Sequence, residues 1–176
     1  FIRLGIRGYT EGEIKEDETF EDNINGALDN GIEAGVYFFT QATSVEEAEE
    51  EAQYVLDAIE PYDVTYPVVL DVEAVNQDNA RTKDLTKEER TEYCIAFCEM
   101  IKQAGYTPMI YGNLKSFMLL LDMEKLEDYD KWKAYYDDQL YSPYNVRVWQ
   151  YTDTGSIDGI DADVDINISF GKISGD

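Results

Sequence analysis

The sequence predicts an α/β fold in which parallel strands alternate with helices. Short apolar runs and segments of helical periodicity follow one another from residue 1 to residue 112, and this order is typical of strands joined by crossover helices. Seven strands can be identified, close to the eight that close a barrel, and no glycine-rich phosphate loop follows any of them. We therefore expect a TIM-like (β/α) barrel with an irregular C-terminal half rather than an open sheet.

The chain starts with a predicted strand, loop and helix. Residues 1–6 are an apolar run typical of a strand, and residues 7–17 read as a loop. The helix that follows carries Phe20 and Ile24 on its apolar side and ends near Gly31.

A second strand at residues 34–39 leads into a helix at residues 44–60. The apolar residues of this helix recur at helical spacing, and a row of glutamates occupies its other side. This pattern predicts an amphipathic helix whose glutamates face solvent. The third strand follows at residues 66–73.

Residues 86–106 carry the clearest helical signals in the chain. Thr86 and Glu89 form a capping box, and Cys94 and Cys98 share one apolar stripe. Side chains four residues apart on a helix have poor geometry for a disulfide, so we expect two reduced thiols packed in the core.

Four further strands complete the pattern. They are predicted at residues 107–112, 130–136, 146–151 and 163–168. The connections between the last three show little helical pattern, which is why the C-terminal half is expected to be irregular.

Composition narrows the functional classes. A chain of 176 residues with 44% hydrophobic content can bury one core and is expected to form a single domain, residues 1–176. Its formal charge of -24 disfavours nucleic acid as a partner, and no apolar run reaches the length of a membrane span. The absence of histidine excludes serine-histidine and cysteine-histidine nucleophiles and most zinc sites. Acid-base chemistry therefore falls to carboxylates, tyrosines or lysines, and we expect no metal or organic cofactor.

Two acids, Asp71 and Glu73, end the apolar strand 66–73. Residues two apart on a strand point to the same side, about 6.6 Å apart at about 3.3 Å per residue. Two carboxylates at that spacing in a partly dry cavity cannot both ionise freely, so one should keep its proton toward neutral pH. Such a pair suits glycoside hydrolysis. The alternative is that one acid pairs with a basic residue such as Arg3 while the other caps a loop.

Aromatic and amide side chains fall at the ends of the other strands. Aromatic rings can stack on sugar faces, and amides can bind sugar hydroxyls. Together these side chains therefore predict a carbohydrate groove, although each ring alone is also compatible with a place in the core. The residues are Tyr37, Tyr111, Trp132, Trp149, Gln150 and Tyr151.

With these motifs the sequence resembles glycoside hydrolase family 25, the bacterial and phage lysozymes that act as N-acetylmuramidases. The resemblance runs from FIRLGIRGY through YPVVLDVE, MIYGN and VWQYTDTGSIDGI to DVDIN, nearly the whole chain. It implies that Glu73 is the general acid, that Asp71 is its paired carboxylate and that Asp165 is a further acid facing the cleft. It also implies that peptidoglycan glycan strands are the binding partner.

The chain also departs from the family pattern. Members begin with a strand that carries a catalytic aspartate, whereas this sequence begins at what would be the second strand, so we expect an N-terminally incomplete catalytic domain. The strands at residues 1–6 and 163–168 would then flank an open seam. Val72 replaces a tryptophan common in relatives, and Lys131 and Lys133 replace apolar residues, which predicts an altered groove.

The function expected from these features is that of a muramidase, a lysozyme-type glycoside hydrolase that cuts the β-1,4 bond between N-acetylmuramic acid and N-acetylglucosamine. The family resemblance places it outside the cell or in the cell wall. The alternative is a non-catalytic glycan-binding or cell-surface interaction domain on the same fold.

Overall fold

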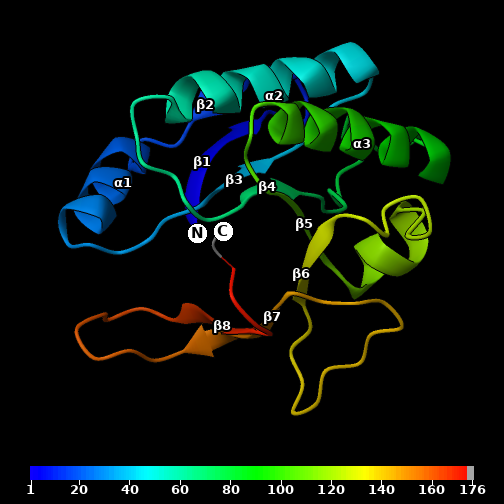
Figure 1. Ribbon diagram of the computed structural model, residues 1–176. Coiled ribbons are helices and arrows are strands. Elements are labelled where there is room, and N and C mark those ends of the chain that lie inside the picture. Colours follow the sequence, from blue (N-terminus) through cyan, green and yellow to red (C-terminus); the bar gives the residue numbers. More distant parts are fainter. Residues whose placement is uncertain (174–176) are drawn as a thin grey trace.

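The computed structural model describes residues 1–173 and has one mixed sheet with helices packed against it (Figure 1). In chain order the elements are β1 (Ile2–Arg7), β2 (Ile14–Glu16), α1 (Phe20–Asp29), β3 (Val36–Phe39), α2 (Val45–Ile59), β4 (Val68–Asp71), α3 (Lys87–Gln103), β5 (Pro108–Asn113), the π-helix η1 (Ser116–Leu120), β6 (Asp130–Ala134), β7 (Val148–Gly155) and β8 (Val164–Ser169). The α/β class and the order of the main elements are as the sequence predicts.

The eight strands form one sheet in the order β2-β1-β3-β4-β5-β6-β7-β8. From β1 to β7 the neighbours pair in parallel, as crossover helices require. Within residues 1–173 no pairing joins β8 to β2, so the sheet follows a barrel order without closing.

The two edges differ from the sequence prediction. The segment predicted as a loop contains β2, which pairs antiparallel with β1 and covers its outer edge. The edges of the sheet are therefore β2 and β8, rather than β1 and β8. The strand β8 also returns antiparallel along β7 instead of parallel to it, because a short connection rather than a crossover helix joins them.

The main core lies between the sheet and the helices, where α2 and α3 lie side by side (Figure 1). The predicted capping box is present: the hydroxyl of Thr86 accepts from the backbone N–H of Glu89, and the Glu89 carboxylate accepts from the Thr86 N–H. Cys94 and Cys98 are both buried and unbonded to each other, as expected. Burial raises the pKa of the Cys94 thiol to about 12, which is typical of a structural cysteine.

The glutamate row of α2 is not entirely solvated, contrary to the sequence prediction. Glu51 is fully buried and accepts from Arg7 Nε at 2.7 Å. Glu50 binds the same guanidinium, again at 2.7 Å, from the exposed side. The pattern could not reveal this, because Arg7 comes from β1 and meets the helix only in the folded protein.

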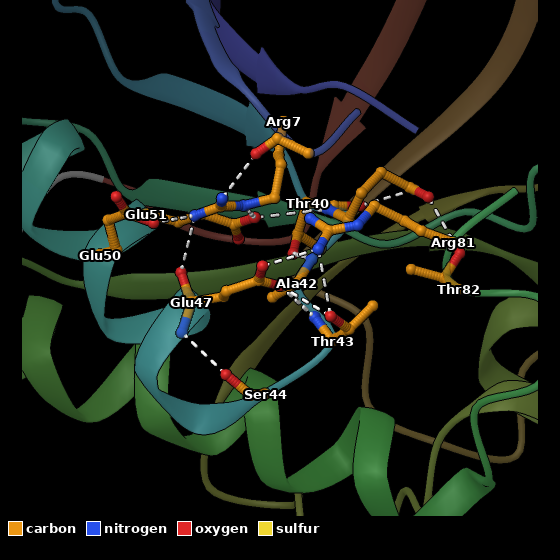
Figure 2. A network of polar contacts seen from close by, with 12 residues as sticks. Arg7, Thr40, Ala42, Thr43, Ser44, Glu47, Glu50, Glu51, Arg81 and Thr82 are labelled. Atoms are coloured by element: carbon orange, nitrogen blue, oxygen red, sulfur yellow. Dashed lines mark hydrogen bonds and ion pairs between the residues drawn. The ribbon is translucent and has the colours of Figure 1, made fainter. Parts of the chain in front are cut away.

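A polar network extends from this ion pair to the ends of the central strands (Figure 2). Arg81 binds Glu47 at 2.6 Å, and the hydroxyl of Thr82 donates to Gln41 Oε1 at 2.9 Å. The backbone N–H of Thr40, just after β3, donates to the carbonyl oxygen of Asp71 at 3.1 Å. Buried polar contacts thus tie the carboxyl ends of β1 and β3 to α2, and the bond from Thr40 ties the end of β4 to that of β3.

Candidate active site

The two predicted carboxylates lie at the carboxyl end of β4. Asp71 is the last residue of the strand, and Glu73 lies two residues after it. Val72 lies between them and packs in the main core, while its N–H donates to the carbonyl oxygen of Tyr111 on β5. The alternation of a strand therefore continues past its formal end, and both acids point away from the core into one cavity.

This cavity has a volume of about 370 Å³. The three acids singled out from the sequence line it, together with four of the six predicted groove residues. The lining residues are Phe1, Tyr37, Asp71, Glu73, Tyr111, Trp132, Gln150, Asp165 and Asn167.

Asp71 is the more deeply buried of the two acids, with 7% of its surface exposed. Burial raises its pKa well above the ordinary value, and the neighbouring charge of Glu73 raises it further. Its Oδ1 has no hydrogen-bond donor among residues 1–173. Glu73 is half-buried, and burial raises its pKa as well. Two acids with raised pKa values in one cavity can supply both a proton donor and a carboxylate near neutral pH.

The structural alternative for these acids does not hold. Arg3 pairs with Asp17 near the edge of the sheet, and among the described residues neither Asp71 nor Glu73 forms an ion pair. The pair is therefore not explained by a structural salt bridge.

Four aromatic rings form one wall of the cavity. The Trp132 ring lies 4.7 Å from the ring of Tyr111 and 6.2 Å from the ring of Tyr37, both in edge-on geometry. Phe1 stacks on Trp132 at 4.6 Å. Trp132 itself is only 7% exposed and packs with the small apolar cluster under the cavity. The ring is thus part of the core and part of the wall at once.

Hydrogen bonds fix the polar groups beside this wall. The hydroxyls of Tyr111 and Tyr136 both donate to Gln150 Oε1, at 2.9 Å and 2.8 Å. Trp132 Nε1 donates to Asn167 Oδ1 on β8 at 2.7 Å. These bonds connect strands β5, β6, β7 and β8 across the cavity.

Two predicted groove residues, Trp149 and Tyr151, do not line the cavity. Trp149 is mostly buried on the opposite side of β7 from Gln150, where its Nε1 donates to the carbonyl oxygen of Tyr135 at 2.7 Å. Lys131 and Lys133 flank Trp132 on β6 and are nearly fully buried on the face away from the cavity. Neither lysine lines the cavity, because neighbouring residues of a strand face opposite sides.

Sequence reasoning missed Phe1 and Asn167 as lining residues. Asn167 follows Asp165 by two positions on β8, so the period of two that linked Asp71 to Glu73 could have identified it. Phe1 carries no comparable signal.

The residues described contain no cluster of three or more histidine, cysteine, aspartate or glutamate side chains arranged to hold a metal ion. None of the helices within residues 1–173 is long and apolar enough to cross a membrane.

Comparison with known proteins gives one family match. The model of the glycosyl hydrolases family 25 matches residues 4–160. Among curated proteins, the uncharacterized protein YegX of Escherichia coli O6:H1 is 30% identical over 167 residues, which cover 93% of this chain and 58% of YegX. The lysozyme of Streptococcus phage Cp-9 is 37% identical over 97 residues, or 54% of this chain and 26% of the lysozyme. The chain thus spans little more than half the length of YegX and about a quarter of the length of the phage lysozyme.

A solved structure shares the fold. The modular autolysin LytC from Streptococcus pneumoniae, in complex with a synthetic peptidoglycan ligand, has a TM-score of 0.80 and 26% sequence identity. The similarity covers 94% of this chain and 39% of LytC.

Proposed function

The chain belongs to the glycosyl hydrolases family 25, and from this premise we propose that it is a muramidase that cuts the β-1,4 bond between N-acetylmuramic acid and N-acetylglucosamine in peptidoglycan. The observation that carries the proposal is the position of Asp71 and Glu73 in one cavity walled by aromatic rings. The likeness to LytC, whose structure holds a synthetic peptidoglycan ligand, supports a glycan of this class as substrate.

In this proposal Glu73 is the general acid. Its half-buried carboxyl has a raised pKa and can hold a proton at the cavity surface, where a glycosidic oxygen would leave. Protonation of that oxygen lets the bond to the anomeric carbon break, and positive charge develops on the sugar ring.

Asp71 would act on the positive charge. Its carboxyl lies deeper in the cavity, and Oδ1 has no protein donor among the described residues. A carboxylate in a dry site attracts the developing positive charge of the sugar more strongly than a carboxylate in water does. Alternatively, Asp71 would orient the N-acetyl group of the substrate so that this group assists bond cleavage. Burial raises the pKa of Asp71, and the charge of an ionised Glu73 raises it further, so a protonated Glu73 favours the charged form of Asp71 that this role requires.

The walls of the cavity would bind the glycan. The rings of Tyr37, Tyr111 and Trp132 offer apolar faces and edges to sugar rings, and Gln150 and Asp165 offer polar groups to hydroxyls and amides. We assign residues 1–176 to one catalytic domain, and its place of action to the cell wall or the extracellular space, where this substrate occurs.

The test is hydrolysis of purified cell walls. The protein should release glycan fragments with N-acetylmuramic acid at the new reducing end, which mass spectrometry after borohydride reduction identifies. N-acetylglucosamine at that end would contradict the proposed bond. Stable co-sedimentation with walls and no release of reducing ends would instead support the glycan-binding alternative.

A further inference from the structure

Lys133 is a buried cation with an unusual set of contacts. Its side chain on β6 is 1% exposed, and burial lowers the pKa of its ammonium. Among residues 1–173 no carboxylate lies within ion-pair distance of it. Instead the ammonium nitrogen lies 5.2 Å from the ring centre of Tyr135 and 5.8 Å from that of Tyr141, and it donates to the Tyr141 carbonyl oxygen at 2.5 Å. Aromatic faces and a carbonyl thus take the place of a counter-ion.

These contacts reach an irregular segment, residues 135–147, which connects β6 to β7 without regular secondary structure. Its ends are held by backbone bonds: the Tyr135 N–H donates to the Gln150 carbonyl, and the Arg147 N–H donates to the Lys131 carbonyl. Between positions 137 and 142, the bond from Lys133 is the one hydrogen bond within the described chain that comes from outside the segment.

The same segment carries Tyr136 to the cavity. The Tyr136 ring is 52% exposed, and its hydroxyl donates to Gln150 Oε1 together with that of Tyr111. With Oε1 occupied by two donors, the Gln150 amide is fixed in one orientation. Its Nε2 donates to no protein acceptor among residues 1–173 and remains for an oxygen of the substrate.

We propose that Lys133 is a positioning residue for the glycan groove: from the outer face of β6 it holds the segment 135–147 in place and thereby keeps Tyr136 on the Gln150 amide. The identity of the substrate in this proposal, a glycan, rests on the proposed function. Its structural part, the immobilisation of the segment, does not depend on that function.

Lys131 provides a matched control. It is two residues earlier on the same strand and the same face, 4% exposed, and it donates to the Glu127 carbonyl at 2.8 Å. It therefore shares the chemistry, burial and strand of Lys133 but contacts the turn before β6 instead of the middle of the segment 135–147.

The first experiment compares Lys133→Met and Lys131→Met by hydrogen exchange. Methionine keeps most of the side-chain volume and removes the charge. We expect amides of residues 136–142 to exchange about tenfold faster in Lys133→Met, the order of effect of losing one charged hydrogen bond with its ring contacts. Lys131→Met should leave these amides unchanged. Equal exchange in both variants would overturn the proposal.

The melting temperature separates positioning from general stability. Replacing a buried unpaired charge by an apolar side chain of similar size should leave the melting temperature of Lys133→Met unchanged or raise it. A second variant, Tyr141→Leu, keeps Lys133 and removes one of its two rings. The amides of residues 136–142 should exchange faster in Tyr141→Leu than in the wild type, but by less than in Lys133→Met. Slower exchange would contradict the role assigned to the two rings around Lys133.

Kinetics on soluble glycan strands from purified peptidoglycan test the consequence for substrate. Lys133→Met should raise KM about tenfold and leave kcat within about twofold, because the loss is in binding rather than in the chemical step. Tyr136→Phe should raise KM too, and the double variant should be no worse than Lys133→Met alone. Additive effects, or a fall in kcat at constant KM, would show that Lys133 does not act through Tyr136.

The two proposals fail in different ways. If the wild-type protein neither hydrolyses nor binds glycan strands, the proposed function is wrong, and the exchange comparison alone decides whether Lys133 immobilises the segment. If the wild-type protein is active but Lys133→Met matches it in exchange and in KM, only the role of Lys133 is wrong.

Discussion

Asp71 and Glu73 face the same cavity although only Asp71 belongs to the strand β4. Val72 between them packs into the core and bonds to β5, which keeps the extended backbone for one more residue. The geometry on which the function depends is therefore set by a core residue with no catalytic group. The following predictions test the roles of the cavity and of the network that supports it.

Glu73→Gln should lower turnover on cell walls by about 10² to 10⁴, the usual effect of removing a positioned general acid. The melting temperature should change little, since the amide keeps the shape of a side chain whose charged form burial already disfavours. Glu92→Gln, on the exposed face of α3, is the control and should retain full activity. Near-normal turnover of Glu73→Gln would remove it from the general-acid role.

Asp71→Asn should abolish hydrolysis and stabilise the protein increasingly as pH rises. The pKa of Asp71 in the folded protein lies above its unfolded value, so the contribution of this group to stability is fully present below the unfolded pKa and is lost as pH rises toward the folded pKa. Asparagine has no proton to lose. The difference in melting temperature between variant and wild type should therefore grow from about pH 4 upward.

The control variant is Asp165→Asn, on exposed β8, which should change stability by less than about 0.5 kcal/mol. A constant difference between Asp71→Asn and the wild type across the pH series would mean that Asp71 does not titrate abnormally.

Trp132→Ala should cost about 3 to 5 kcal/mol of stability, because the ring is nearly buried and packs on the apolar cluster under the cavity. The sequence left both a groove and a core position open for Trp132, and its burial beside the cavity argues for an effect on both glycan binding and folding. Thermal unfolding and binding of glycan strands should be measured on the same samples.

Trp132→Phe separates the two effects. It keeps an aromatic ring next to Tyr111 but removes the bond from Nε1 to Asn167, worth about 1 kcal/mol. Asn167→Ala removes the same bond and leaves the indole. If stacking is the main contribution, glycan affinity should fall most in Trp132→Ala, less in Trp132→Phe and least in Asn167→Ala. An unchanged affinity in Trp132→Ala would identify a purely structural tryptophan.

Glu51→Leu should destabilise the protein by about 3 to 5 kcal/mol, because it leaves the buried guanidinium of Arg7 without its inner partner. The double variant Arg7→Met with Glu51→Leu should lose less than the sum of the single variants, which chemical denaturation can measure as a coupling energy. Arg3→Met removes the ion pair between Arg3 and Asp17, in which the Arg3 side chain is about half exposed. This variant, on the same strand as Arg7, should change stability by less than about 1 kcal/mol. Equal losses at Arg3 and Arg7 would contradict the importance of burial.

The sequence by itself determined the three α-helices, seven of the strands and the central pair of acids. Periods of 3.6 and 2 are local properties, so α2, α3 and the alternation of Asp71 with Glu73 follow from neighbouring residues alone. The capping box of α3 is local as well, because its two bonds join residues three apart.

Only the tertiary structure decided which of these residues meet and which face each one takes. The depth of Asp71, the pairing of Arg7 with Glu51 and the place of Lys133 behind the groove depend on contacts between elements far apart in the chain. The direction of β8 and the edge strand β2 likewise depend on pairing partners that no local pattern specifies. The physical reason is that long-range packing sets burial and electrostatics. On α2, Glu50 is exposed to solvent whereas its neighbour Glu51 is fully buried, and the free energy of the charged side chain differs accordingly between the two positions.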